Sequence, residues 1–83
     1  MNPMVQSVEA LAGHLLRLVF DNGEVRVFDL KPYLDKGVFR ELQDERRFRK
    51  VRVVAGSVEW PGEIDLSHDT LFVKSAALTA ETA

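Results

Sequence analysis

Hydrophobic and polar residues alternate with a period of two along the first third of the chain, which is typical of β-strands with one buried face. The alternation predicts three strands of an antiparallel meander, over residues 4–11, 15–20 and 24–30. Asn22 and Gly23 separate the second strand from the third. Because both residues adopt positive φ at low cost, this pair strongly indicates a two-residue hairpin loop.

The register of this hairpin follows from the loop length. A two-residue loop and a four-residue loop give the same register, and the longer loop would relieve the like-charge contact between Asp21 and Glu24. In the predicted register Phe20 lies opposite Val25 and Leu18 lies opposite Val27, so that one face is uniformly apolar. A three-residue loop would instead place Phe20 against Glu24. Slipping by one residue exchanges the two faces, and we therefore expect the register with the apolar face. The other face is then mixed, with the pairs Val19–Arg26 and Arg17–Phe28.

The middle of the chain predicts short helices. Proline is tolerated in the first helical turn, so Pro32 predicts a turn of helix over 31–34. Val38, Phe39 and Leu42 have helical spacing, which predicts a short helix lying across the sheet.

Further short elements follow. Asp44 is a predicted N-cap for a helix over 45–50, in which Phe48 is the buried residue. Valine-rich runs predict short strands over 51–54 and 58–60. Ser67 is a predicted cap for a last helical turn over 69–73.

These elements predict one α+β domain over residues 1–83, an antiparallel β-meander with two short helices packed on one face and further short strands. We expect an ordered core over about 4–75 and a frayed, small-residue tail over 76–83. A chain of 83 residues has a modest core. Self-association would stabilise it, and a homodimer formed through an open sheet edge is one prediction.

The composition limits the chemistry. The chain has no cysteine, which excludes disulfides and thiolate chemistry. It shows no cationic start followed by an apolar run and no segment of about 20 apolar residues. We therefore expect a cytoplasmic protein that does not bind membranes.

The net charge of -2 is unevenly distributed. Residues 39–56 carry six basic and three acidic side chains, whereas residues 57–83 carry one basic and five acidic side chains. This asymmetry indicates complementary faces more than a strongly basic nucleic-acid binder. The basic cluster consists of Arg40, Arg46, Arg47, Arg49, Lys50 and Arg52. It either meets an acidic partner or phosphates, or is a solvated face balanced by neighbouring carboxylates.

Trp60 has two interpretations. A tryptophan can anchor an interface through its large rigid surface, or fill the core with its indole N–H bonded to a carbonyl. The predicted partner-binding residues are Arg46, Arg47, Arg49, Lys50, Arg52 and Trp60.

Other polar residues suit structural roles better than chemistry. Asp65, His68 and Asp69 are too few for a metal cage, and turn capping is the more common role of such aspartates. Asp29 is predicted to accept a hydrogen bond from the following turn. His14 lies in a predicted turn, and nothing in the sequence brings it to His68. We predict no catalytic residue, no metal and no cofactor, and hence a protein that is not an enzyme.

Several segments in order resemble a known family. They are Phe20-Asp21-Asn22-Gly23, Phe28 to Leu34, Gly37-Val38-Phe39, Val51-Arg52-Val53, Val58-Glu59-Trp60-Pro61 and Asp65-Leu66. This string resembles the bacterial domain-of-unknown-function family 2442 over nearly the whole chain. The family usually places a glycine two residues before the aspartate, whereas this chain has Gly62-Glu63-Ile64-Asp65.

The resemblance implies a small α+β fold with an antiparallel sheet covered on one side by short helices, and it implies no activity. Family members often lie beside another small domain in pairs reminiscent of toxin–antitoxin modules. Some carry an added helix-turn-helix domain, whereas this chain stops at Ala83 without one. We therefore expect a protein-interaction or regulatory module, such as the antitoxin-like half of a two-gene pair. The alternative is a nucleic-acid-binding accessory domain that uses Arg46–Arg52.

Overall fold

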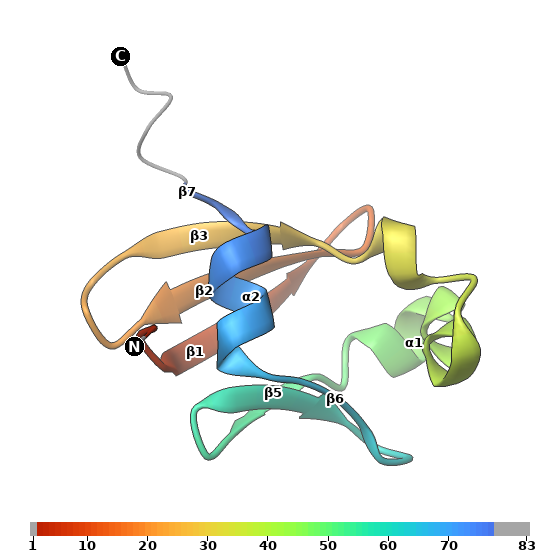
Figure 1. Ribbon diagram of the computed structural model, residues 1–83. Coiled ribbons are helices and arrows are strands. Elements are labelled where there is room, and N and C mark those ends of the chain that lie inside the picture. Colours follow the sequence, from red (N-terminus) through yellow and green to blue (C-terminus); the bar gives the residue numbers. More distant parts are fainter. Residues whose placement is uncertain (1, 78–83) are drawn as a thin grey trace.

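The alternating residues of the first third of the chain form the predicted meander in a computed structural model, which describes residues 2–77. Strands β1 (Val5–Leu11), β2 (Leu15–Phe20) and β3 (Val25–Asp29) run antiparallel (Figure 1). With the later strand β7 (Ala76–Ala77), they make a four-stranded sheet in the order β1-β2-β3-β7, which we call sheet A.

A second sheet forms from the short apolar runs of the second half. Strands β4 (Arg52–Val54), β5 (Ser57–Trp60) and β6 (Ile64–Leu66) make a three-stranded antiparallel sheet, which we call sheet B. Strand β6 was not predicted, because Asp65 at its centre was interpreted as a turn-capping residue. The sheets are joined where the backbone N–H of Val5 donates to the carbonyl of Gly56 (2.8 Å). The fold is α+β, as predicted.

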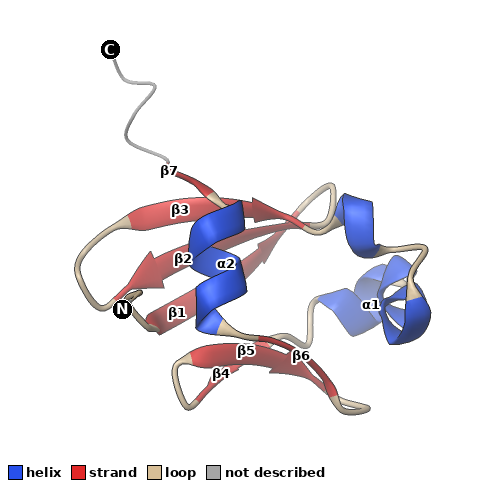
Figure 2. Ribbon diagram, in the orientation of Figure 1, coloured by secondary structure: helices blue, strands red, loops and turns tan. Residues whose placement is uncertain are grey.

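Short helical segments connect the strands (Figure 2). They are η1 (Lys31–Tyr33), η2 (Gly37–Gln43), α1 (Glu45–Phe48) and α2 (His68–Lys74). The predicted caps are confirmed. The Asp44 side chain accepts a hydrogen bond from the backbone N–H of Arg46 (2.9 Å), and Ser67 accepts one from Thr70 (3.3 Å). None of the helices within residues 2–77 has the length and apolar character needed to cross a bilayer.

The orientation of Val38 differs from the prediction. Its side chain is 52% exposed, whereas Leu42 is buried and Phe39 packs against the core. The segment η2 is a 3₁₀ helix, in which residues three apart share a face. Phe39 and Leu42 therefore point inward together, and Val38 lies on another side.

The core lies between the inner face of sheet A, sheet B and α2 (Figure 1). Sheet A contributes Val5, Leu16, Leu18, Phe20 and Phe28; sheet B contributes Val58, Trp60, Ile64 and Leu66; α2 contributes Leu71. Leu30, Leu42 and Phe48 from the connecting segments complete it. The even-numbered residues of β2 thus define the inner face of sheet A.

The end of the described chain is more ordered than predicted. Ala76 and Ala77 were expected to belong to a frayed tail, but they pair with Val27 and Arg26 of β3. The remainder of the predicted tail, residues 78–83, lies outside the described residues.

The predicted register between β2 and β3 is wrong. Leu18 lies opposite Arg26, and the backbone N–H of Phe20 donates to the carbonyl of Glu24 (2.9 Å). Phe20 therefore does not lie opposite Val25, and the loop contains three residues. The one-residue difference moves Arg26 to the inner face of sheet A and Val25 to its outer face.

The loop itself explains the three-residue form. Gly23 has a φ of 91°, the left-handed conformation that ends a three-residue hairpin loop after a turn. Its backbone N–H donates to the carbonyl of Phe20 (2.9 Å). The side-chain oxygen of Asn22 accepts a hydrogen bond from the backbone N–H of Glu24 (3.0 Å). The Asn22-Gly23 pair therefore lies in a three-residue loop here, and not in the two-residue loop that it most often forms.

Arg26 occupies the inner face because its charge is fully partnered there. Its guanidinium pairs with the Glu24 carboxylate (2.9 Å) and donates to the side-chain and backbone oxygens of Ser75 (2.7 and 2.8 Å). The guanidinium carbon lies 4.5 Å from the ring centroid of Phe72, in a cation–π contact. Arg26 therefore attaches the end of α2 to sheet A.

We expect Arg26→Met to lower the free energy of unfolding by about 1–3 kcal/mol, because the hydrogen bonds of a mostly buried charged group are lost. Urea denaturation followed by tryptophan fluorescence measures the change. Arg52→Met is the matched control. It breaks a pair with Glu59 in which the Arg52 side chain is 65% exposed, so its cost stays below about 1 kcal/mol. Equal losses in the two variants would contradict the inward role of Arg26.

Candidate functional site

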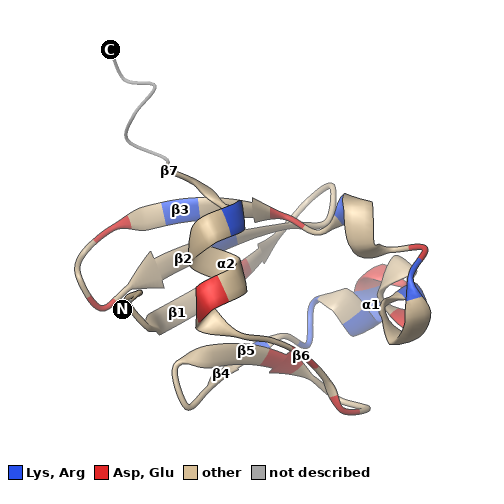
Figure 3. Ribbon diagram, viewed as in Figure 1, with Lys and Arg blue, Asp and Glu red and all other residues tan. Residues whose placement is uncertain are grey.

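The basic surface is the part of the chain where sequence analysis placed partner binding. We use this name for Arg46, Arg47, Arg49, Lys50 and Arg52, all of which are exposed. Asp44 starts α1, and the single helical turn directs Phe48 into the core while the arginines around it project outward. Lys50 follows in the turn after α1, and Arg52 begins β4 (Figure 3).

Three of the five cations are paired with carboxylates. Arg47 pairs with Glu41, Arg49 with Glu45 (3.8 Å) and Arg52 with Glu59 (2.8 Å). All three pairs involve exposed arginine side chains, so each contributes only about 0–1 kcal/mol. Neighbouring carboxylates therefore compensate the charge of three cations of the cluster, as one of the two interpretations predicted. Because each of these ion pairs is weak, the carboxylates of a partner could replace them at low cost.

Arg46 and Lys50 differ from the other three. Within residues 2–77, neither forms an ion pair with a carboxylate. Arg46 lies within α1, whereas Lys50 lies in the turn between α1 and β4. Arg40, the sixth cation of the predicted cluster, donates instead to the backbone carbonyl of Asp35 (3.2 Å).

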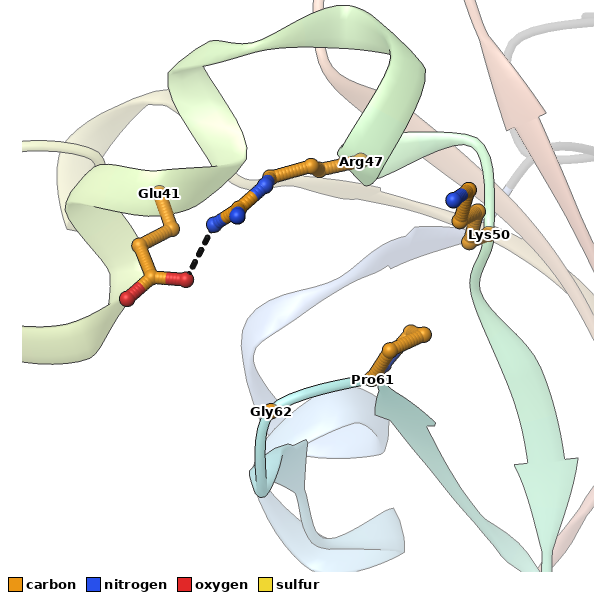
Figure 4. Close-up of a pocket in the computed structure, with 5 residues that line it drawn as sticks. All are labelled: Glu41, Arg47, Lys50, Pro61 and Gly62. Carbon is orange, nitrogen blue, oxygen red and sulfur yellow. Dashed lines mark hydrogen bonds and ion pairs between the residues drawn. The ribbon is translucent and has the colours of Figure 1, made fainter.

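A pocket of about 220 Å³ adjoins the basic surface. It is lined by Glu41, Arg47, Lys50, Pro61 and Gly62. Figure 4 shows Arg47 extending toward Glu41, with Lys50 close to Pro61. The pocket brings the end of α1 together with the turn between β5 and β6, which are distant in the sequence. Its cations and proline suit a single acidic side chain of a partner.

Trp60 lies beneath this region and is not an interface anchor. Only 1% of its surface is exposed, and its indole N–H donates to the carbonyl of Phe48 (2.8 Å). The two rings stack with their centroids 6.4 Å apart. The core interpretation of Trp60 is therefore correct, and its inclusion among the partner-binding residues is corrected. Trp60 supports the basic surface by fixing the end of α1.

The acidic and histidine residues of the second half do not converge. Asp65 is exposed on β6 opposite Glu59, and the cap of α2 is Ser67, so the predicted capping role of Asp65 is not observed. The imidazole Nδ1 of His68 lies 3.1 Å from the carbonyl of Pro3 and 3.6 Å from the Asp69 carboxylate. Among residues 2–77, no three His, Cys, Asp or Glu side chains form a group that could hold a metal.

The remaining candidates have structural partners. Nε2 of His14 lies 2.9 Å from the carbonyl of Leu42, and its ring packs against Phe48. Asp29 accepts a hydrogen bond from the backbone N–H of Lys31 (2.9 Å), as predicted. Partial desolvation raises the pKa of Asp29, but the backbone and side-chain hydrogen bonds of Lys31 and its charge together hold that pKa below its usual value.

The fold and this surface define a small α+β domain of two antiparallel sheets with a cluster of cations beside a shallow pocket. The chain matches the family described as "Protein of unknown function (DUF2442)" over residues 5–77, and it belongs to that family. No curated protein matches the chain.

One solved structure is clearly similar. It is the crystal structure of the Putative DNA Binding Protein NE0471 from Nitrosomonas europaea ATCC 19718, with a TM-score of 0.77 and 31% sequence identity. The similarity covers 87% of this chain and 48% of that chain. This chain therefore spans about half the length of that protein.

We expect Trp60→Phe to lower the free energy of unfolding by about 1–3 kcal/mol, because the buried carbonyl of Phe48 loses its donor. Urea denaturation followed by circular dichroism measures the change. Tyr33→Phe is the control, since the Tyr33 hydroxyl forms no hydrogen bond within the described part of the chain. Its expected cost is below about 0.5 kcal/mol. If the two variants unfold at the same urea concentration, the indole bond does not stabilise the site.

Proposed function

We propose that this protein is a non-enzymatic protein-interaction module whose basic surface binds an acidic region of a partner protein. The partner arrangement that we propose is a two-gene pair, of which this chain is the antitoxin-like or regulatory half. The observation that carries the proposal is the exposure of Arg46 and Lys50 without a carboxylate partner in residues 2–77, beside the pocket that Lys50 lines.

The chemistry of the surface favours carboxylates as its ligands. Arginine offers a planar set of donors that matches a carboxylate, and Arg47 already contacts the Glu41 carboxylate through one of its guanidinium nitrogens. The pocket holds both signs of charge, with Glu41 opposite Arg47 and Lys50. Such a mixed site discriminates among partners by the position of each charge and not by net charge alone. The proposal that the protein is not an enzyme is supported by its two histidines. Each imidazole contacts a backbone carbonyl, which is a structural role.

The proposal is tested by affinity purification of the tagged full chain from its native host. The variant Arg46→Glu/Lys50→Glu reverses the two uncompensated charges, and Lys36→Glu/Lys74→Glu makes the same change of charge elsewhere on the surface. We expect an acidic protein to co-purify with the wild type and the control, and to be reduced about tenfold or more with the first variant. Equal recovery with both variants, or no partner with the wild type, would refute the proposal.

A second candidate function is nucleic-acid binding by the same surface, which the name of the Nitrosomonas europaea protein favours. Only Arg46 and Lys50 of the basic surface lack a carboxylate partner within residues 2–77, and two cations support few phosphate contacts. Affinity should therefore fall with salt with a logarithmic slope of only about −2, against roughly −10 for a strong duplex binder. The charge pairing of the surface thus favours the protein partner.

Fluorescence anisotropy with labelled duplex and single-stranded DNA tests this second function. If it holds, binding is detected at about 50 mM salt, falls with that shallow slope, and disappears in Arg46→Glu/Lys50→Glu but not in Lys36→Glu/Lys74→Glu. A flat titration of the wild type at the lowest salt excludes it.

A further inference from the structure

The outer face of sheet A is unusually apolar for a solvated sheet face. The register places five aliphatic side chains on the side opposite to the core: Leu11, Leu15, Val19, Val25 and Val27. Each is partly exposed, and none belongs to the core or packs against it. Figure 2 shows α2 crossing the other face of this sheet. An antiparallel sheet with one solvated face normally carries polar residues there, and contiguous apolar patches of this kind mark contact surfaces.

Two charged residues lie side by side within this face. Glu9 of β1 is directly opposite Arg17 of β2, and Val27 of β3 continues the same row. Within the described residues, neither Glu9 nor Arg17 forms a side-chain ion pair. A second acid on this face, Asp29 opposite Leu15, is paired with Lys31 (3.1 Å). Glu9 and Arg17 are therefore the acid and the base of this face that lack an ion pair in residues 2–77.

We infer that the outer face of sheet A binds a second copy of this chain. In a symmetric dimer the same surface contacts itself, so a surface with one acid beside one base is complementary to its own copy. A twofold axis along the strands, between β1 and β2, places Glu9 of each copy against Arg17 of the other. The same axis places Leu11 of one copy against Leu15 of the other. Because β1 is the edge strand of sheet A, β3 with Val25 and Val27 then lies beside this contact and not within it. The two sheets then pack with aligned strands, as in β-sandwiches.

This contact differs from the predicted dimer through a sheet edge, and it is independent of the basic surface. Sheet A contributes to it two strands of seven and six residues, β1 and β2. The interface is therefore smaller than the standard of about 800 Å² per partner, and we expect a dissociation constant on the order of 10–100 µM.

Charge reversal provides the test, by sedimentation velocity of the full chain from about 5 to 500 µM. We expect the wild type to shift from monomer to dimer over this range. Glu9→Arg and Arg17→Glu should each be monomeric, because in either variant positions 9 and 17 carry the same charge and would repel across the interface.

A mixture of the two variants restores the attraction. Each contact between position 9 of one copy and position 17 of the other then joins opposite charges, so the mixture should form a heterodimer. Because mixing cannot relieve repulsion within one chain, recovery in the mixture is specific to the intermolecular contact.

An aliphatic variant adds an independent arm. Val19→Lys on the outer face is expected to abolish the dimer, and Val73→Lys, at a position that is 64% exposed on α2, is expected to leave it unchanged. Circular dichroism confirms that each variant is folded. A monomeric wild type at the highest concentration, a dimer that persists in Val19→Lys, or a mixture that stays monomeric would overturn the inference.

Discussion

The register between β2 and β3 determines which side chains of sheet A enter the core and which stay on its outer face. It is set by the three-residue loop that ends at Gly23 and by the inward position of Arg26. A cation on the inner face would be costly without partners. Glu24, Ser75 and Phe72 supply them, and in doing so they attach α2 to sheet A. One set of polar contacts therefore fixes both the sheet and the helix that covers it.

The same register places aliphatic side chains on the outer face of sheet A. By turning Arg26 inward, it turns Val25 and Val27 outward, next to Val19 and Arg17. The register that gives Arg26 its partners on the inner face therefore also places aliphatic side chains on the outer face of sheet A. In a domain with a small core, such a face is a cost in water that association with another surface removes.

Local patterns in the sequence were sufficient for most of the elements, with β6 and β7 as exceptions, but not for their long-range contacts. Asp44 and Ser67 were identifiable as caps, because a cap and its helix are adjacent in the sequence. The hairpin register was not, because Arg26 reaches Ser75, which is 49 residues away, and no alternation reveals that contact. Val38 was misplaced because apolar spacing does not distinguish an α-helix from a 3₁₀ helix.

The same limit applies to the candidate site. The charge count located the basic cluster, but only the structure shows which cations are compensated, because Glu59 lies on the strand beside Arg52. Trp60 had two interpretations in the sequence, and its bond to Phe48 decides between them. That bond also holds the end of α1 near the β5–β6 turn. The shape of the pocket therefore depends on the core contact between Trp60 and Phe48, which the sequence does not reveal. The cations that line the pocket can be identified from the local sequence.

The two proposed contact surfaces belong to different elements of the fold. The basic surface lies on α1 and β4, whereas the aliphatic face lies on β1, β2 and β3. If a dimer formed through sheet A leaves both basic surfaces free, one particle carries two of them. Two weak sites on one particle bind a partner with two acidic sites more tightly than either site alone, through effective concentration. Self-association thus offers a physical route by which a basic surface with only two cations unpaired within residues 2–77, Arg46 and Lys50, gains affinity.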